Sequence, residues 1–203
     1  MTKHDWKKSL KHLYNPPAKP VEVHVPPMSF IMADGQGDPN TSADFQAVTA
    51  ALYALSFTLK FESKQRGQDY AVYPLEGLWW VEGGGEVDPT TDDRTRWQWT
   101  LMVAQPDFIT AAQVQAAHET VRRRKNLPLL ERCRFEVYDE GLAAQIMHIG
   151  PYSAEKPTID RLHAFIIGQG ARLVGKHHEI YLGDPRRAAP EKLKTILRQP
   201  MRI

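Results

Sequence analysis

The feature that most constrains the fold is an approximate internal repeat. A strand, a glycine- or proline-containing turn, a helix and a tyrosine-bearing strand follow one another twice, in the same order, along the 203 residues. When the copies are aligned, "IMADGQGDPN" corresponds to "IMHIGPYS" and "VYPLEG" corresponds to "IYLGD". The repeat predicts an α+β fold of duplicated β-α-β-β (SHS2-type) units, with a pseudo-twofold antiparallel sheet and helices on one side. Two paired halves leave a concave groove on the open sheet face between them, so we expect a central ligand groove there.

Hydrophobic spacing locates the elements of the first half. Residues 21–37 have the β-branched and aromatic composition of strands, and apolar residues at three- and four-residue spacing predict a helix from Phe45 to Leu59. Further strands are expected over 69–82 and 96–106, with the loop "GGGEVDPTTDDRT" between them. Thr110 and Gln113 form a capping-box pattern, which predicts a helix to about Lys125. The apolar residues of that helix are expected to cover the sheet; they are Val114, Ala117 and Val121.

The second half follows the same plan. Residues 134–150 read as a strand pair or one bent strand, and 151–170 read as a helix with Pro157 in its first turn. We then expect a strand at "KHHEIYLGDPRR", a short helix from Pro190 to Leu197 and a final strand at "QPMRI". The expected domain plan is a lead-in over 1–20, with a short helix around 6–13, and a ligand-binding domain over 21–203. Its halves span about 21–105 and 134–203, joined by the helix at about 110–125.

Composition narrows the class of protein. The formal net charge is only +2, and the one dense basic cluster, residues 122–125, reads as the cationic end of a helix, so no nucleic-acid partner is expected. One cysteine excludes an intramolecular disulfide and fits a reducing compartment. No apolar stretch is long enough for a membrane span, and no apolar leader is present. These features predict a cytoplasmic protein.

Two segments of the second half carry a family resemblance. "HIGPYSAEKPTIDRLHAFI", followed by "HHEIYLGDPRRAAPEKLKTILRQP", resembles the GyrI-like small-molecule-binding domain, which also forms the effector-binding part of multidrug-responsive regulators. The strand "VYPLEGLWW" is similar to that of stand-alone members of this length. The resemblance covers the chain from about residue 21 to its end. It implies a duplicated β-α-β-β fold with a central pocket for bulky aromatic, often cationic, ligands.

The resemblance also implies roles for individual residues. Glu179 matches the acidic residue at the pocket floor of the family, and Trp79, Tyr152 and Tyr181 match its aromatic walls. Some stand-alone members resemble hydrolases that open the cyclopropane ring of DNA-alkylating natural products.

Strand geometry gives an independent reason to single out Glu179. Alternation places Glu179 and Tyr181 on one face of their strand and Ile180 and Leu182 on the other. Ile180 and Leu182 are expected to face the helices, which leaves Glu179 facing the groove. Among aromatic rings its carboxylate can balance a cationic ligand or direct a water molecule onto a bound electrophile. The alternative is a solvated glutamate with no function.

Further candidate ligand-binding residues come from the repeat and from strand parity. Trp79 is favoured over Trp80 for the groove, because aligning Tyr73 with Tyr181 matches odd positions to odd positions. Trp99 is either core or pocket wall, and Glu76 is either a second pocket acid or a turn residue. His148 and Tyr152 flank the glycine-proline turn, where the Tyr152 hydroxyl can reach Glu179, a ligand or a backbone group.

No metal or cofactor is expected. His177 and His178 are adjacent, point to opposite faces and lack a spaced partner. The first hypothesis for function is therefore a stand-alone protein, monomer or homodimer, that binds hydrophobic or cationic aromatic small molecules. The alternative is a cyclopropyl hydrolase in which Glu179, assisted by Tyr181, activates water. A third possibility is a protein-binding module that uses no pocket.

Overall fold

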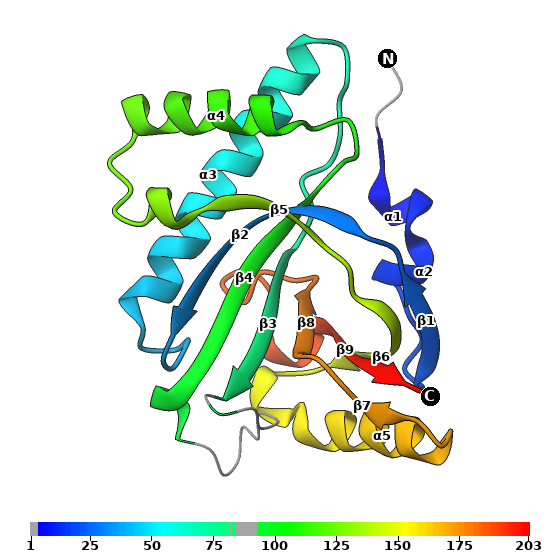
Figure 1. Ribbon diagram of the computed structural model, residues 1–203. Helices are drawn as coiled ribbons and strands as arrows, with labels where there is room; N and C mark the ends of the chain where they lie inside the picture. The colour runs from blue at the N-terminus through cyan, green and yellow to red at the C-terminus, as the bar shows by residue number, and fades with distance from the viewer. Residues whose placement is uncertain (1–3, 82, 84–92) are drawn as a thin grey trace.

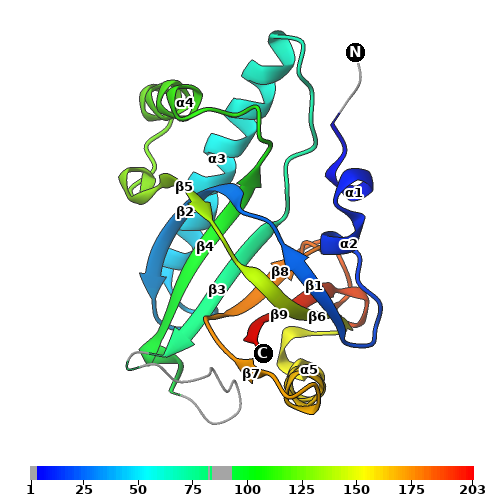
Figure 2. The same cartoon turned by 45° about the vertical axis from the view of Figure 1, so that its right-hand side comes forward.

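One strongly curved antiparallel sheet forms the body of the protein (Figure 1, Figure 2). The computed structural model describes residues 4–81, 83 and 93–203, so most of the predicted loop "GGGEVDPTTDDRT" lies outside the described residues. The strands are β1 (Val21–Val25), β2 (Met28–Gln36), β3 (Leu75–Val81), β4 (Trp97–Gln105), β5 (Arg134–Tyr138), β6 (Gly141–Ile149), β7 (Arg172–Leu173), β8 (His177–Tyr181) and β9 (Lys194–Arg202).

The order of the strands across the sheet confirms the predicted duplication. The order is β1-β6-β9-β8-β3-β4-β2-β5, with the short β7 paired to β9. Reading this order from either end gives the same sequence of equivalent strands, because β1, β2, β3 and β4 correspond to β5, β6, β8 and β9. The pseudo-twofold axis therefore passes between β3 and β8, and these two strands form the seam between the halves.

Two long helices lie on the same face of the sheet. They are α3 (Ala43–Gln65), which Ser42 caps, and α5 (Lys156–Gly168), which has a proline in its first turn. Phe45 of α3 packs against Trp99 of β4, and apolar residues of α5 pack on Ile146 and Leu197 of the other half. Residues paired across neighbouring strands share a face of the sheet. Glu179 pairs with Leu197 on one side and with Gly77 on the other, and Trp79, two residues after Gly77, pairs with Trp99. Both helices and Glu179 are therefore on one face.

The remaining helices lie outside that arrangement. The helix α4 (Ala111–Arg124) begins with the predicted Thr110–Gln113 capping box, but it packs on α3 rather than on the sheet (Figure 1). The short α1 (Trp6–Ser9) and α2 (Lys11–Tyr14) cover the opposite face of the sheet near the seam. Leu13 is completely buried there, which contributes about 1.5–3 kcal/mol to stability. The lead-in is thus part of the core.

One predicted element and one predicted orientation differ in the structure. The helix expected from Pro190 to Leu197 is wrong: one 3₁₀ turn, Pro190–Lys192, precedes β9, whose central residues are buried between β6 and β8. A strand buried on both faces lacks polar alternation and resembles a helix by composition. Residues 134–150 form two strands, β5 and β6, which is the first of the two expected alternatives, and these strands do not pair with each other. The predicted orientation of Ile180 toward the helices is also wrong, since Glu179 has that orientation.

Candidate ligand site at the seam

Glu179 lies at the centre of the sheet, on β8. Its neighbours across the strands are Gly77 of β3 and Leu197 of β9, and its side chain shares a face with His177 and Tyr181. The glutamate side chain is 17% exposed. The predicted groove on the open sheet face is therefore corrected: Glu179 faces the helix-bearing side, in the strip of sheet between α3 and α5.

A chain of hydrogen bonds fixes the Glu179 carboxylate. The indole Nε1 of Trp79 donates to the Tyr181 hydroxyl oxygen at 3.1 Å, and that hydroxyl donates to Glu179 Oε2 at 2.7 Å. Burial, together with the charge of Glu179, raises the pKa of Tyr181 well above its ordinary value. The phenol is therefore a permanent donor that fixes one carboxylate oxygen.

Gly77 makes room for this chain. A Cβ at position 77 would lie 2.8 Å from Trp79 Nε1 and 3.2 Å from the Tyr181 hydroxyl. Any larger residue would push the indole or the phenol away from its partner. A glycine inside a strand, directly opposite Glu179, is explained by this close approach.

Aromatic rings from three further elements lie against Tyr181 and Trp79, the two donors of this hydrogen-bond chain. The Tyr152 ring, from the 3₁₀ turn Tyr152–Ala154 before α5, meets the Tyr181 ring edge-on at 5.6 Å. The rings of Phe45 and Trp97 lie 6.1 and 5.7 Å from Trp79. Phe45 was assigned to the helix core by its spacing in sequence, and only the packing of α3 over the seam shows its place beside Trp79.

Glu155 is a second acidic residue of the site that the sequence did not reveal. It is only 3% exposed, directly precedes α5, and makes no capping hydrogen bond with its side chain. Burial, reinforced by the charge of Glu179, raises the pKa of Glu155 to about 9. At neutral pH the site therefore contains a protonated carboxyl group close to Glu179.

Two histidines complete this cluster. His148 is buried, with Nδ1 3.1 Å from the Thr158 hydroxyl and Nε2 3.3 Å from the Pro151 carbonyl oxygen, and burial lowers its pKa. It is a neutral group that ties β6 to the start of α5. His177 Nε2 lies 3.5 Å from Glu179 Oε1, and within the described part of the chain neither ring nitrogen has a hydrogen-bond partner. Buried polar atoms of this kind are ready to bind polar groups of a ligand or water.

Three predicted ligand-binding residues lie elsewhere. Trp99 shares the face of Glu179 but is completely buried between Phe45 and Gly35, so it is core. Tyr73 stacks on Trp6 on the opposite face, at 5.4 Å. Glu76 is 1% exposed on that opposite face as well, inside β3 and not in a turn. Glu76 and Trp79 are three residues apart on β3, so strand alternation alone places them on opposite faces.

Beneath the site, on the opposite face, Glu76 belongs to a buried network of charges. His178 Nε2 lies 3.0 Å from Glu76, and its Nδ1 lies 2.9 Å from Glu140. Arg198 contacts Glu140 at 3.0 Å, and Tyr14 donates to Glu76 at 2.8 Å. The network joins β3, β8, β9 and α2, so it holds the seam strands together directly under Glu179.

Comparison with known proteins identifies the family. Residues 18–201 match the GyrI-like small molecule binding domain. The chain belongs to this family. The family is described as binding small molecules, and the duplicated α+β fold of this chain agrees with membership of it.

Solved structures place this GyrI-like protein among full-length relatives. A protein from Listeria innocua described as a hydrolase is 40% identical, with a TM-score of 0.89, and the match covers 99% of this chain and 100% of that one. An uncharacterized conserved protein from Listeria innocua is also 40% identical, with a TM-score of 0.90 and coverage of 98% and 99%. The C-terminal domain of EcmrR, at 11% identity, TM-score 0.57 and coverage of 91% and 97%, shares the fold. A comparison with curated proteins found no match.

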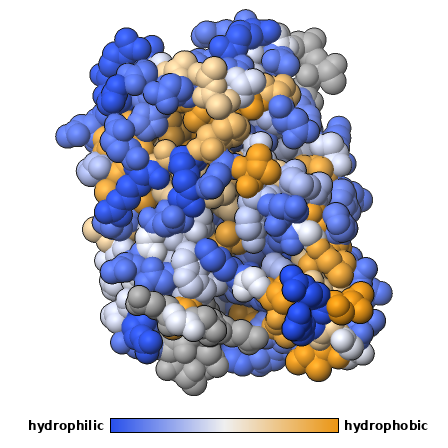
Figure 3. All heavy atoms as spheres, viewed as in Figure 1, coloured by the Kyte–Doolittle hydropathy of each residue, from blue (hydrophilic) through white to orange (hydrophobic). Residues whose placement is uncertain are grey.

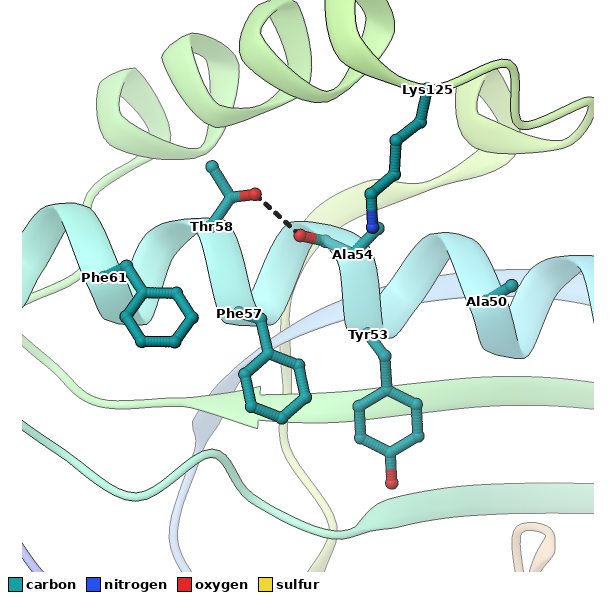
Figure 4. A pocket seen from close by; sticks show the side chains of 7 residues that line it. All are labelled: Ala50, Tyr53, Ala54, Phe57, Thr58, Phe61 and Lys125. Atoms are coloured by element: carbon teal, nitrogen blue, oxygen red, sulfur yellow. Dashed lines mark hydrogen bonds between the residues drawn. The ribbon is translucent and has the colours of Figure 1, made fainter.

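Outside the seam, this GyrI-like protein has a shallow hollow along α3 and exposed apolar side chains near α5. A hollow of about 390 Å³ lies along α3, where Tyr53, Phe57 and Phe61 point to the same side and Lys125 reaches toward Ala54 (Figure 4). None of the described residues that line it is a carboxylate. Apolar surface also gathers near α5 and the C-terminal end, where Ile167 and Ile203 are exposed (Figure 3). In the parts of the chain that the structure describes, no group of three or more histidine, cysteine, aspartate or glutamate side chains could hold a metal ion. No helix in those parts has the length and apolar character needed to cross a membrane.

Proposed function

We propose that this GyrI-like protein is a hydrolase that adds water to a bulky aromatic electrophile held beside Glu179. The observation that carries the proposal is the chain from Trp79 through Tyr181 to Glu179, which leaves Oε1 of the carboxylate as the oxygen not bound by the phenol. A fixed carboxylate oxygen is suited to accept a proton from an attacking water molecule. The full-length relative described as a hydrolase supports this reading over binding alone.

The substrate class that we propose is a strained ring conjugated to a carbonyl group, such as a cyclopropane fused to a dienone. Glu179 takes one proton from water, and the water oxygen forms a bond to a ring carbon. The carbon–carbon bond of the ring breaks, and its electron pair moves through the conjugated system to the carbonyl oxygen. That oxygen then needs a proton, and the product is an alcohol with a phenol. The rings of Tyr152, Tyr181 and Trp79 suit a flat aromatic substrate.

A second candidate function is capture of cationic aromatic compounds without turnover. A carboxylate within a set of aromatic rings attracts a cation, and each ring adds about 0.5–2 kcal/mol of cation–π attraction. The site would then serve to sequester such compounds.

One variant separates the two functions. In Glu179→Gln the side chain keeps its size but loses the basic oxygen, so we expect turnover of a cyclopropane-containing substrate to fall by about 10²–10⁴-fold while substrate binding changes little. Turnover is followed by mass spectrometry and binding by calorimetry. Glu22→Gln on β1, an exposed glutamate, is the matched control and should behave as wild type.

The opposite result is equally informative. Wild-type turnover in Glu179→Gln contradicts the role of Glu179 as base. Absence of turnover in the wild-type protein, combined with a loss of affinity in Glu179→Gln for cationic dyes but not for neutral dyes of the same shape, favours the capture function instead.

A further inference from the structure

Glu155 is a buried carboxyl group that the fold does not need for capping or for an ion pair. Its Oε1 has no hydrogen-bond partner within the described residues, although the side chain is almost completely buried. Leaving a buried polar atom unpaired costs about 1–3 kcal/mol, so such atoms are retained mainly where they meet a ligand or water. This makes Glu155 a candidate for a role in the site.

The surroundings of Glu155 favour its protonated form. The groups that face it are Glu179 and Tyr181 of β8, Tyr152 of its own 3₁₀ turn and Thr195 of β9. His148 of β6, tied to Pro151 just before that turn, is neutral. Burial raises the pKa of both tyrosines, that of Tyr152 to about 12, so they are neutral too. Of the described groups that set the ionisation of Glu155, none is a cation.

Two carboxyl groups in one buried site can divide the roles of acid and base. When like charges are close, one group holds a proton and the other stays ionised. Glu179 accepts from the Tyr181 hydroxyl, which stabilises a carboxylate. Oε1 of Glu155 has no partner within the described residues, and the Thr195 hydroxyl lowers the pKa of Glu155 by less than burial raises it. The pair therefore offers a protonated carboxyl group, Glu155, beside a second carboxyl group whose Oε1 is not bound by the phenol.

We infer that Glu155 is the proton donor of the site, giving its proton to the substrate oxygen that receives the electron pair of the breaking ring bond while Glu179 takes a proton from water. The inference rests on the proposed hydrolysis. The step balances: one proton leaves water for Glu179, one leaves Glu155 for the substrate, and solvent returns a proton from Glu179 to Glu155 after product release. No oxidant or further reactant is required.

The test compares wild type, Glu155→Gln and Glu155→Asp over pH 6–10 with the same cyclopropane-containing substrate. For wild type we expect turnover to fall as the pH rises past about 9, because the donor loses its proton. Glu155→Gln should lose about 10²–10⁴-fold in kcat at pH 7 with an unchanged Kd, and its remaining activity should lack the alkaline decline. Glu155→Asp, still an acid, should retain the decline and part of the rate.

Unfolding midpoints measured at each pH show whether a loss of turnover comes from unfolding. His178, on the opposite face, also has its pKa raised to about 9, so its titration could lower the activity in the same pH range. His178 is still present in Glu155→Gln, so that variant separates the two groups. An alkaline decline that persists in that variant belongs to another group and overturns the inference.

Two results would overturn the role of Glu155 while leaving hydrolysis intact: a wild-type rate in Glu155→Gln, or a wild-type rate that stays constant from pH 7 to 10. The second needs no variant and so does not depend on how the variants fold. Absence of any turnover in wild type overturns the inference together with the proposed function. Loss of turnover in Glu179→Gln combined with a wild-type rate in Glu155→Gln overturns only the inference.

Discussion

At the scale of single residues, the Tyr181 hydroxyl has two partners, and removing it tests both. In Tyr181→Phe, Glu179 loses a charge-assisted hydrogen bond worth about 1.5–3 kcal/mol, and Trp79 Nε1 loses its acceptor in a buried position. We expect kcat to fall at least about tenfold and the free energy of unfolding to fall by about 1–3 kcal/mol. Kinetics and urea unfolding measure the two effects. Tyr138→Phe, on the opposite face, is the control, and equal kinetic losses in both variants would contradict the assigned role.

Strand parity predicted part of the site at this scale. It placed Glu179 and Tyr181 on one face, because alternation in a strand depends only on the spacing of residues, whereas Trp79 of the neighbouring strand was favoured through the repeat alignment. Glu155 could not be found in this way, because an acid at the start of a helix is ordinary in sequence. Its burial depends on how α5 meets β9 and β8, which local sequence does not encode. The misplacement of Tyr73 and Glu76 came from a degenerate repeat alignment.

At the scale of elements, the seam between β3 and β8 depends on the absence of a side chain at Gly77. In Gly77→Ala the new Cβ is too close to Trp79 and Tyr181, so we expect a loss of about 1–3 kcal/mol in unfolding free energy and weaker ligand binding. Gly168→Ala, at the end of α5 with no atom within 4 Å of the new Cβ, is the control and should be neutral or slightly stabilising. Thermal unfolding and calorimetric titration check both, and an unchanged Gly77→Ala would show that the aromatic rings move freely.

Elements with clear periodicity were predicted well, whereas those defined by partners were not. The helices α3 and α5 carry a strong apolar repeat and proper start signals. The start of β9 was read as part of a helix because its residues lack the polar–apolar alternation of a half-exposed strand, and only its pairing with two strands makes it extended. The packing of α4 on α3 equally depends on the position of a neighbour.

At the scale of the whole molecule, the buried network predicts how stability changes with pH. Burial alone would lower the pKa of His178, but Glu140 and Glu76 raise it to about 9, so its stabilisation is complete below about 6.5 and is lost as the pH rises through 9. Glu155, whose pKa is raised, acts in the same direction from about pH 4.5 upward. Burial alone would raise the pKa of Glu140, but His178 and Arg198 lower it to about 2, and that stabilisation is lost as the pH falls toward 2.

We therefore expect the free energy of unfolding to be highest near pH 5–6 and to decrease by about 1–3 kcal/mol toward pH 9. Urea unfolding across this range measures the decrease. His178→Gln should be less stable at pH 6 and should depend less on pH, and stability that increases from pH 6 to 9 in wild type would contradict the assignment.

The order of strands links the two halves through their first strands. β1 of the first half pairs with β6 of the second, and β5 of the second half pairs with β2 of the first. The first strand of each half is thus part of the sheet of the other half, as in a domain-swapped dimer. The two halves cannot separate as rigid bodies, because such a motion would break the pairing of β1 with β6 and of β5 with β2. Access to the proposed site at Glu179, whose side chain is already 17% exposed, therefore does not depend on a separation of the two halves.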